Sequence, residues 1–448
     1  MKNIKTYSTY KNSEVVWLGK VPENWKIIKS KRILIETSIK GFPDEELLAA
    51  TQTKGVVPKS VYGKTTVTAT KNFETLKLVE KGDFVISLRS FQGGIEYAHY
   101  RGIISPAYTI LKPQEEVVHK YFRYLLKSKR YISGLTLLVT GIREGQNIDT
   151  GKFKDSYLPL PPKPEQTAIA NFLDYKLEKI ERFIKKKKQL IELLIEQKAA
   201  IINQAVTKGL NPNVNLKPSG IEWLGDIPEH WEVRNTFEYF KNRKIKNIGL
   251  INNNRLSLSH GKIVTKSILD GNGLVPDSYE TYQIVEPGNI IFRFTDLQND
   301  KKSLRTGLVY DFGIITSAYV AIETTKTNCN SKYFHLLFHS YDLSKAFYNL
   351  GGGVRQSMSF ADLKKIKICC PSVIEQEQIV IYIETETTKI DKTISTIEKE
   401  IALVEEYKTT LISEAVTGKI DVRDFKIPEV ETPLAMVAED ATAYNIKE

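Results

Sequence analysis

The sequence predicts an α+β protein in which two globular α/β domains form a tandem pseudo-repeat, separated by two long helices. Three observations lead to this fold class. A tryptophan-rich segment occurs twice, and further blocks of sequence recur behind each copy in the same order. Each copy also ends in a segment of more than forty residues without Pro or Gly, which favours a long helix.

The repeat is visible in five matched blocks. All four tryptophans lie in the first block, WLGKVPENW at 17–25 and WLGDIPEHW at 223–231, 206 residues apart. A short apolar run after a glycine turn keeps this offset, at 84–86 and 290–292. Lys-Tyr-Phe recurs after 212 residues, whereas Glu-Gln and Ala-Val-Thr recur after 210. The drifting offset indicates that insertions fall in loops between the blocks.

The repeat predicts five parts of the chain. In each half, the Trp-rich segment leads into a mixed region with short strands, and a proline-marked boundary then precedes the helical segment. The predicted parts are a first globular domain (1–164), a first long helix (165–208), a second globular domain (209–374), a second long helix (375–419) and a tail (420–448).

Each predicted helix carries an apolar seam in steps of three and four residues, which is a heptad pattern interrupted by lysines. Each helix would lie on its own domain, or the two seams would pack on each other. We expect the second arrangement, because both seams persist for more than three heptads. The seam residues are Leu177, Ile180, Ile184, Ile191 and Leu194 in the first helix and Ile390, Ile394, Ile397, Ile401, Val404 and Leu411 in the second.

The charge is unevenly distributed. Residues 375–448 have 8 basic and 17 acidic residues, a net charge of −9. Because the whole chain has a net charge of +11, residues 1–374 must have a net charge of +20. Such a surplus suggests a polyanionic partner, usually nucleic acid, but general solubility accounts for the charge equally well. The tail is acidic and without periodicity, so we expect it to be disordered.

Several protein classes are excluded. The sequence has no run of eighteen apolar residues and no apolar segment at its start, which argues against a membrane or secreted protein. Three cysteines fit a reducing cytoplasm better than a disulfide scaffold.

Nucleotide-binding patterns fail on spacing. The Gly-Lys-Thr at 63–65 resembles the end of a phosphate-binding loop, but Pro58 stands where the first glycine is required. The three glycines at 351–353 lack the spacing of a dinucleotide fingerprint. We therefore expect no bound nucleotide cofactor.

Metal and catalytic patterns fail as well. His335 and His339 are one helical turn apart, but Leu336 replaces the glutamate of a metalloprotease. Cys369 and Cys370 have no second pair at metal-ligand spacing, so buried thiols on a strand are expected. The sequence predicts neither a metal site nor catalytic residues.

The matched segments resemble a known family. WLGKVPENW and WLGDIPEHW, the boundary LPLPPKPEQTAIANFL and the closing LISEAVTGKID are similar to the specificity subunit of type I restriction–modification enzymes. The resemblance covers nearly the entire chain except the tail. One departure is CCPSVIEQEQI, which has a single proline where the first half has PPKP.

The resemblance implies a function and a set of partners. Each globular domain would be a target recognition domain that reads one half of a split site in double-stranded DNA. The helices would pack antiparallel, hold the domains apart and dock two methyltransferase subunits, onto which restriction and translocation subunits assemble. S-adenosylmethionine, ATP and Mg²⁺ would belong to those partners.

Candidate DNA contacts follow from side-chain chemistry. Arginine, lysine, asparagine and glutamine read base edges, and basic and hydroxyl groups bind phosphates. Arg143 and Arg355 lie in matched loops before the proline boundary, which favours phosphate contact, since the two domains would read different bases. The candidates are Arg89, Gln92, Arg143 and Gln146 in the first domain and Arg293, Gln298, Arg355 and Gln356 in the second.

Two other functions compete with this interpretation. An autonomous DNA-modifying enzyme would transfer methyl groups as a purified chain. A coiled-coil adaptor with no nucleic-acid role would give a complex without salt-dependent DNA binding.

Overall fold

The computed structural model describes residues 5–62, 72–140, 147–266, 278–295, 297, 304–327, 329–348 and 357–427. The chain divides into two compact units. Unit 1 comprises Met1–Lys186 and Lys399–Glu448, and unit 2 comprises Lys187–Glu398. The division falls within both long helices, so each unit contains one globular part and a stretch of each helix.

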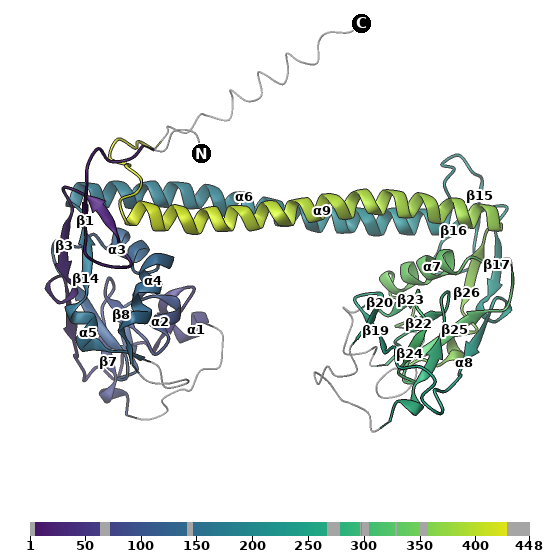
Figure 1. Ribbon diagram of the computed structural model, residues 1–448. Coiled ribbons are helices and arrows are strands. Elements are labelled where there is room, and N and C mark those ends of the chain that lie inside the picture. The colour runs from purple at the N-terminus through teal and green to yellow at the C-terminus, as the bar shows by residue number, and fades with distance from the viewer. Residues whose placement is uncertain are drawn as a thin grey trace, which may run out of the picture. The chain divides into compact units, whose positions relative to one another are not determined.

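Unit 1 is built around a four-stranded antiparallel sheet in the order β4-β11-β8-β9. These strands are Leu34–Thr37, Thr109–Pro113, Phe84–Ile86 and Glu96–Tyr97. Figure 1 labels strand β8 of this sheet. The other strands pair two by two: β1 (Tyr10–Asn12) with β2 (Lys20–Pro22), β3 (Lys26–Lys29) with β14 (Tyr157–Leu160), β5 (Leu48–Thr51) with β6 (Gly55–Pro58), β7 (Lys77–Val79) with β10 (Gly102–Ile104), and β12 (Val139–Thr140) with β13 (Asn147–Ile148). Its short helices are α1 (Lys59–Tyr62), α2 (Ser90–Gly93), α3 (His119–Leu125), α4 (Lys129–Leu135) and α5 (Thr150–Asp155).

Unit 2 repeats this plan. Its four-stranded sheet has the order β18-β25-β22-β23, formed by Phe240–Arg243, Val320–Thr324, Ile290–Phe292 and Thr306–Leu308. The remaining pairs are β15 (Leu216–Pro218) with β16 (Asp226–Pro228), β17 (Glu232–Asn235) with β26 (Lys367–Cys370), β19 (Leu256–Ser259) with β20 (Lys262–Thr265), and β21 (Gln283–Val285) with β24 (Gly313–Ile315). One helix, α7 (Ser331–Leu343), stands where unit 1 has α3 and α4, and α8 (Phe360–Leu363) precedes β26.

The two long helices are α6 (Lys163–Lys208) and α9 (Val373–Val416), each of which begins two residues before the predicted start. In unit 1 the start of α6 meets the end of α9, because the Tyr121 hydroxyl donates to the Val416 carbonyl at 2.8 Å and the Gln166 side chain accepts from the Val118 amide at 2.8 Å. A salt bridge of 2.9 Å joins Lys408 to Glu181.

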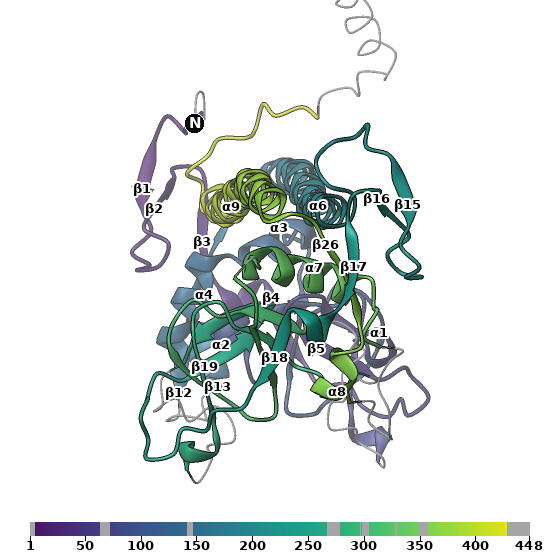
Figure 2. The same ribbon diagram turned by 90° about the vertical axis from the view of Figure 1, so that its right-hand side faces the viewer.

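In unit 2 the opposite helix ends meet (Figure 2). The Tyr333 hydroxyl donates to the Val206 carbonyl at 3.2 Å, and the Gln376 side chain accepts from the Asn330 amide at 2.9 Å. Lys198 and Asp391 form a salt bridge of 2.6 Å. Because rising residue numbers in α6 pair with falling numbers in α9 within each unit, the helices are antiparallel.

The predicted seam residues are the less exposed positions of these helices. Leu177, Ile390, Ile397, Ile401 and Leu411 are buried. Half-buried seam residues are Ile180, Ile184, Ile191, Leu194, Ile394 and Val404. Together with the repeated sheet, the long helices confirm the predicted fold class.

The tryptophan motif joins each globular part to its helix. Trp25 is fully buried and its indole N–H donates to Glu165 at 2.7 Å, while Trp231 donates to Glu375 at 3.0 Å. These glutamates occupy the first turns of α6 and α9, where carboxylates complement the helix dipole. The second tryptophan of each motif thereby fixes the start of a long helix.

The expectation of a disordered tail is wrong for residues 420–427. Ile420 and Val422 are buried in the core of unit 1, and the Phe425 ring packs edge-on against Phe172 at 5.0 Å. Burying each of these apolar side chains favours order, and the two acidic residues of this segment are matched by two basic ones. Residues 428–448 lie outside the described residues.

Candidate nucleic-acid interface

Two of the four predicted DNA contacts of the first half are on α2, the short helix after β8. Arg89 caps the N-terminus of this helix and Gln92 lies in it, and both side chains are exposed. The helix lies beside α4 and β13. Because β12 and β13 flank residues 141–146, the strand that follows Arg143 and Gln146 is a neighbour of α2, although those two residues lie outside the described residues.

In the second half only Arg293 of the predicted contacts is described, and it is half-exposed just after β22. Gln298, Arg355 and Gln356 lie outside the described residues. The two ends of the segment 349–356 can still be located. The Met358 amide donates to the Phe294 carbonyl at 3.2 Å, and the rings of Phe347 and Phe294 are 5.2 Å apart, so both ends lie next to the segment that carries Arg293.

Unit 2 also has a basic groove that the sequence reading missed. A cavity of about 640 Å³ borders Met358 and contains three lysines, Lys244, Lys246 and Lys364, with no acidic residue among its lining residues. Lysines in a groove without carboxylates suit phosphate binding. The signal in the sequence was the basic run KNRKIK at 241–246.

A groove of unit 1, lined by other positions of the repeat, has mixed charge. It also measures about 640 Å³ and lies between the turn that joins β5 to β6 and the helices of the same unit. Lys54, Arg123 and Lys127 line it together with Asp174 and Glu178. Asp174 accepts a hydrogen bond from Arg123 at 3.2 Å, so part of the positive charge of this groove is neutralised within unit 1. Burial lowers the pKa of His99 in this groove, which favours the neutral imidazole.

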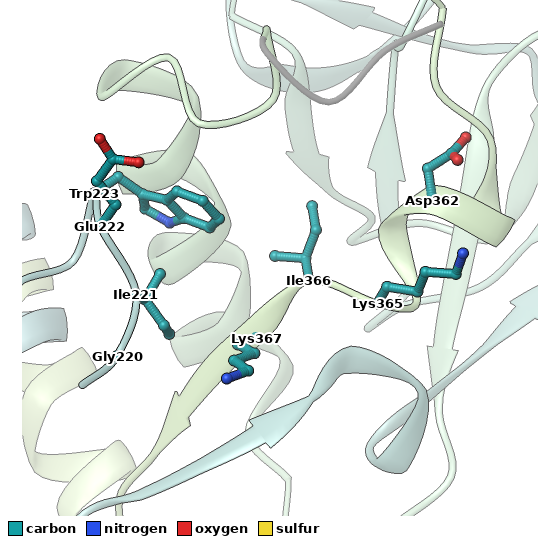
Figure 3. Close-up of a pocket in the computed structure, with 8 residues that line it drawn as sticks. All are labelled: Gly220, Ile221, Glu222, Trp223, Asp362, Lys365, Ile366 and Lys367. Carbon is teal, nitrogen blue, oxygen red and sulfur yellow. The ribbon is translucent and has the colours of Figure 1, made fainter.

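A smaller pocket occurs in both units beside the first tryptophan of the motif. In unit 2 it has a volume of about 370 Å³, and Trp223, Ile221 and Ile366 surround it (Figure 3). In unit 1 a pocket of about 240 Å³ borders Trp17 and Tyr157. A feature present in both units does not distinguish two DNA sequences, so we do not count it among the reading residues.

The described residues include no group of three or more His, Cys, Asp or Glu side chains that could hold a metal ion. His335 and His339 lie on α7 with ring centroids 6.2 Å apart, and burial lowers the pKa of His335 to about 3. Burial also raises the pKa of both Cys369 and Cys370 to about 12, which keeps them as thiols. The glycine motifs at 63–65 and 351–353 lie outside the described residues.

Among the helices that the structure describes, none is long and apolar enough to cross a membrane.

Known proteins share this architecture. The chain is 24% identical to the type I restriction enzyme MjaVIII specificity subunit of Methanocaldococcus jannaschii, over 78% of this chain and 81% of that protein. Its fold is similar to the HsdS subunit from Thermoanaerobacter tengcongensis, with a TM-score of 0.51 and 12% identity over 89% of this chain and 98% of that one. A chain from a study of complex assembly and conformational transition of the type I R-M system gives a TM-score of 0.59 and 13% identity, covering 89% of this chain and 99% of that one.

The family model for the type I restriction modification DNA specificity domain matches twice, at residues 18–193 and 238–406. The two matches fall in the two halves of the repeat and together span most of the chain. The chain therefore belongs to the family of type I restriction modification DNA specificity domains, and it carries two such domains in tandem.

Proposed function

We propose that this chain reads a bipartite DNA target, with one half-site recognised by unit 1 and the other by unit 2. The observation that carries the proposal is a shared scaffold with different reading elements. Both units have the same four-stranded sheet order, but β8 of unit 1 is followed by the helix α2, whereas residues 293–295 after β22 of unit 2 form neither a helix nor a strand. Two units that share one fold but differ in the surface beside the sheet suit two half-sites of different sequence.

In this proposal the exposed side chains of Arg89 and Gln92 contact bases in the first half-site. Arg293 has the same role in the second. The lysines of the basic groove, Lys244 and Lys246, bind phosphates beside the second half-site and fix the orientation of unit 2 on the duplex.

The chain has no catalytic role of its own in this proposal. The paired helices α6 and α9 dock two methyltransferase subunits, and restriction and translocation subunits join them in a cytoplasmic complex. Chemistry that needs S-adenosylmethionine, ATP or Mg²⁺ takes place on those partners.

The test is a domain exchange followed by methylation mapping. Residues 232–370, which hold the sheet of unit 2 and its loops, are replaced by the equivalent region of a relative with a different target. We expect one half of the methylated sequence to change and the other to stay the same. A change in both halves would contradict the modular proposal.

Matched controls separate this function from its rivals. The reciprocal exchange in unit 1, of residues 26–160, is expected to change only the other half-site. Methyl transfer by the purified chain alone would indicate an autonomous enzyme. A complex whose DNA affinity does not depend on salt would indicate an adaptor without a role in DNA binding.

A further inference from the structure

A buried arginine contacts residues 293–295 of unit 2, the segment that carries the proposed base contact Arg293 and is called the reading segment below. Arg305, which immediately precedes β23, has an exposed fraction of 0%. Its guanidinium donates to the main-chain carbonyls of Thr295 at 2.6 Å and Arg293 at 3.2 Å. The Arg293 amide in turn donates to the Arg305 carbonyl at 2.8 Å. Arg305 therefore holds the main chain on both sides of Phe294.

The same guanidinium also contacts one end of the segment 349–356. Its Nε donates to the Tyr348 hydroxyl at 3.4 Å, and Tyr348 is the last described residue before this segment, which includes Arg355. Beyond the other end of the segment, the Met358 amide donates to the Phe294 carbonyl. Arg305 thus contacts the segment that carries Arg293 and one end of the segment that carries Arg355 and Gln356.

The energetics make this contact an effective constraint. A buried cation is costly unless its donors are satisfied, and a buried carbonyl that loses its donor pays a desolvation penalty as well. Asp342, which is also buried, accepts from the Arg305 amide at 2.5 Å, and its burial raises the pKa of its carboxyl to about 6. Any displacement of residues 293–295 would break several of these interactions together.

Unit 1 also has a cation bound to the main chain beside its predicted contacts, at the far end of the segment that follows β8. The Lys127 ammonium donates to the carbonyls of Gly93 at 2.8 Å and Gln52 at 3.0 Å, and to the carboxylate of Glu96 at 2.6 Å. Gly93 is the last residue of α2, the helix that carries Gln92. Gly94 allows the close approach, since a Cβ there would lie 2.4 Å from the Leu126 carbonyl oxygen.

The two cations come from different positions of the repeat. The pair Phe84 and Tyr97 of unit 1 has the same place in the sheet as the pair Ile290 and Leu308 of unit 2. In this alignment of the two units, Arg305 is equivalent to Gly94. Lys127 aligns by the Lys-Tyr-Phe block with His339, which has no such charge. Each unit therefore supplies a cation to the main chain of its reading segment by its own means.

We propose that Arg305 and Lys127 are positioning residues that determine specificity, each for its own half-site, without touching DNA. This inference rests on the proposed function, because it assumes that the anchored segments read bases. Each cation fixes the main chain from which the reading side chains project. Replacing the cation keeps the side chains that face DNA but removes the hydrogen bonds that fix the main chain beneath them, so their positions become less well defined.

The experiment measures binding of the assembled complex to the cognate duplex and to duplexes with one mismatch in either half. The variants are Arg305→Met and Lys127→Met, which keep much of the side-chain length without the charge. The matched control in unit 2 is Arg243→Met, since Arg243 is a buried arginine that pairs with Glu286 and Glu323. In unit 1 it is Lys77→Met, since Lys77 donates to the Tyr108 carbonyl at 2.7 Å.

We expect Arg305→Met to lower discrimination against second-half mismatches at least tenfold and to leave first-half discrimination unchanged. Lys127→Met should do the reverse. The slope of affinity against salt should stay constant, because no phosphate contact is removed. Arg305→Lys keeps the charge but not the paired donors, so it should retain part of the discrimination and serves as the milder variant if Arg305→Met does not fold.

Three results would overturn the inference. Full discrimination in both Met variants would show that the anchors are unnecessary. An equal loss in Arg243→Met and Lys77→Met would indicate general destabilisation, and a fall of about one in the salt slope would indicate a direct phosphate contact. A wild-type complex that does not discriminate either mismatch would instead refute the proposed function itself.

Discussion

Units 1 and 2 agree closely where the globular part meets the long helices and differ where DNA would be read. Both have a buried tryptophan bonded to the first glutamate of a long helix, and both have a tyrosine bonded to a carbonyl at the end of the other helix. On the side that we propose reads DNA, unit 1 has a short helix anchored by Lys127, whereas unit 2 has a segment without helix or strand at 293–295, anchored by Arg305. The junction therefore fixes the fold, and the reading side can change without altering the junction.

The junctions themselves are not identical. Glu165 accepts hydrogen bonds from Tyr7, Asn24 and Trp25, whereas Glu375 accepts from His230 and Trp231. The carboxylate of unit 1 is also the more buried of the two. Since a buried acceptor with more donors is costlier to disturb, the junction of unit 1 should be the less tolerant of change.

The largest expected effect tests the part of the comparison that should be equal in both units. Ile397 in unit 2 and Ile401 in unit 1 are both buried on the seam of α9. Replacing either with aspartate should lower the free energy of unfolding by about 4 kcal/mol, because it buries an unpaired charge. Chemical denaturation measures this loss. Ile374→Asp is the control, since Ile374 is exposed on the same helix, and a loss as large there would mean that the seam has no special role.

A second prediction concerns the glycine that follows each long helix. Gly209 and Gly418 both have a positive φ, which costs an alanine about 1 kcal/mol. A Cβ at Gly418 would also lie 2.4 Å from Pro22 Cδ, whereas at Gly209 the nearest atom is a glutamate oxygen at 3.3 Å. Gly418→Ala should therefore cost about 3 kcal/mol and Gly209→Ala about 1 kcal/mol. Hydrogen exchange in each unit reports these values, and equal losses would mean that both junctions relax alike.

A third prediction uses pH to separate the units. Burial lowers the pKa of His335 in unit 2 from 6.5 to about 3, so on acidification the unfolded chain binds a proton that the folded chain does not. The free energy of unfolding that depends on neutral His335 has its full value above pH 6.5 and falls as the pH drops toward 3. Between pH 7 and pH 5 it should cost unit 2 about 2 kcal/mol.

The matched variant is His335→Gln, which should abolish this loss. Asp342 has a raised pKa and acts in the opposite sense, but it is present in both proteins, so their difference isolates His335. In unit 1 burial raises the pKa of Glu96 to about 7, and acidification should therefore stabilise that unit. Hydrogen exchange of the whole chain at both pH values measures each unit, and an identical pH response in His335→Gln would refute the assignment.

The sequence predicted what depends on periodicity and repetition. The duplicated Trp motif predicted two similar units, and the seam from Ile390 to Leu411 predicted the second long helix. The Glu-Gln blocks at 165–166 and 375–376 recur in the sequence, and both make equivalent hydrogen bonds in the structure. The Trp motif, the Glu-Gln block and the apolar seam could be predicted because each occupies the same place in both units, and equal places in a repeated fold require similar residues at similar spacing.

Single contacts between distant residues could not be predicted in this way. Lys127 and Arg305 are isolated cations at different positions of the repeat, so no spacing pattern distinguishes them. The helix α2 has only four residues, too few for a periodic signal. The docking of Phe425 was missed because two or three apolar residues in an acidic segment do not reveal the surface that receives them.

The smallest expected effect tests the antiparallel register of the long helices. Lys408 pairs with Glu181 in unit 1 and Lys198 pairs with Asp391 in unit 2, and all four side chains are substantially exposed to solvent. Exposed ion pairs contribute little, so a double-mutant cycle with alanine at both positions should give a coupling energy of about 0.5 kcal/mol for each pair. High salt should reduce both couplings, because it screens exposed charges. The control is the cycle between Glu181 and Asp391, which lie on different helices and belong to different pairs, and which should give no coupling. Coupling in this mismatched cycle, or its absence in both matched cycles, would mean that the two helices are paired in a different register.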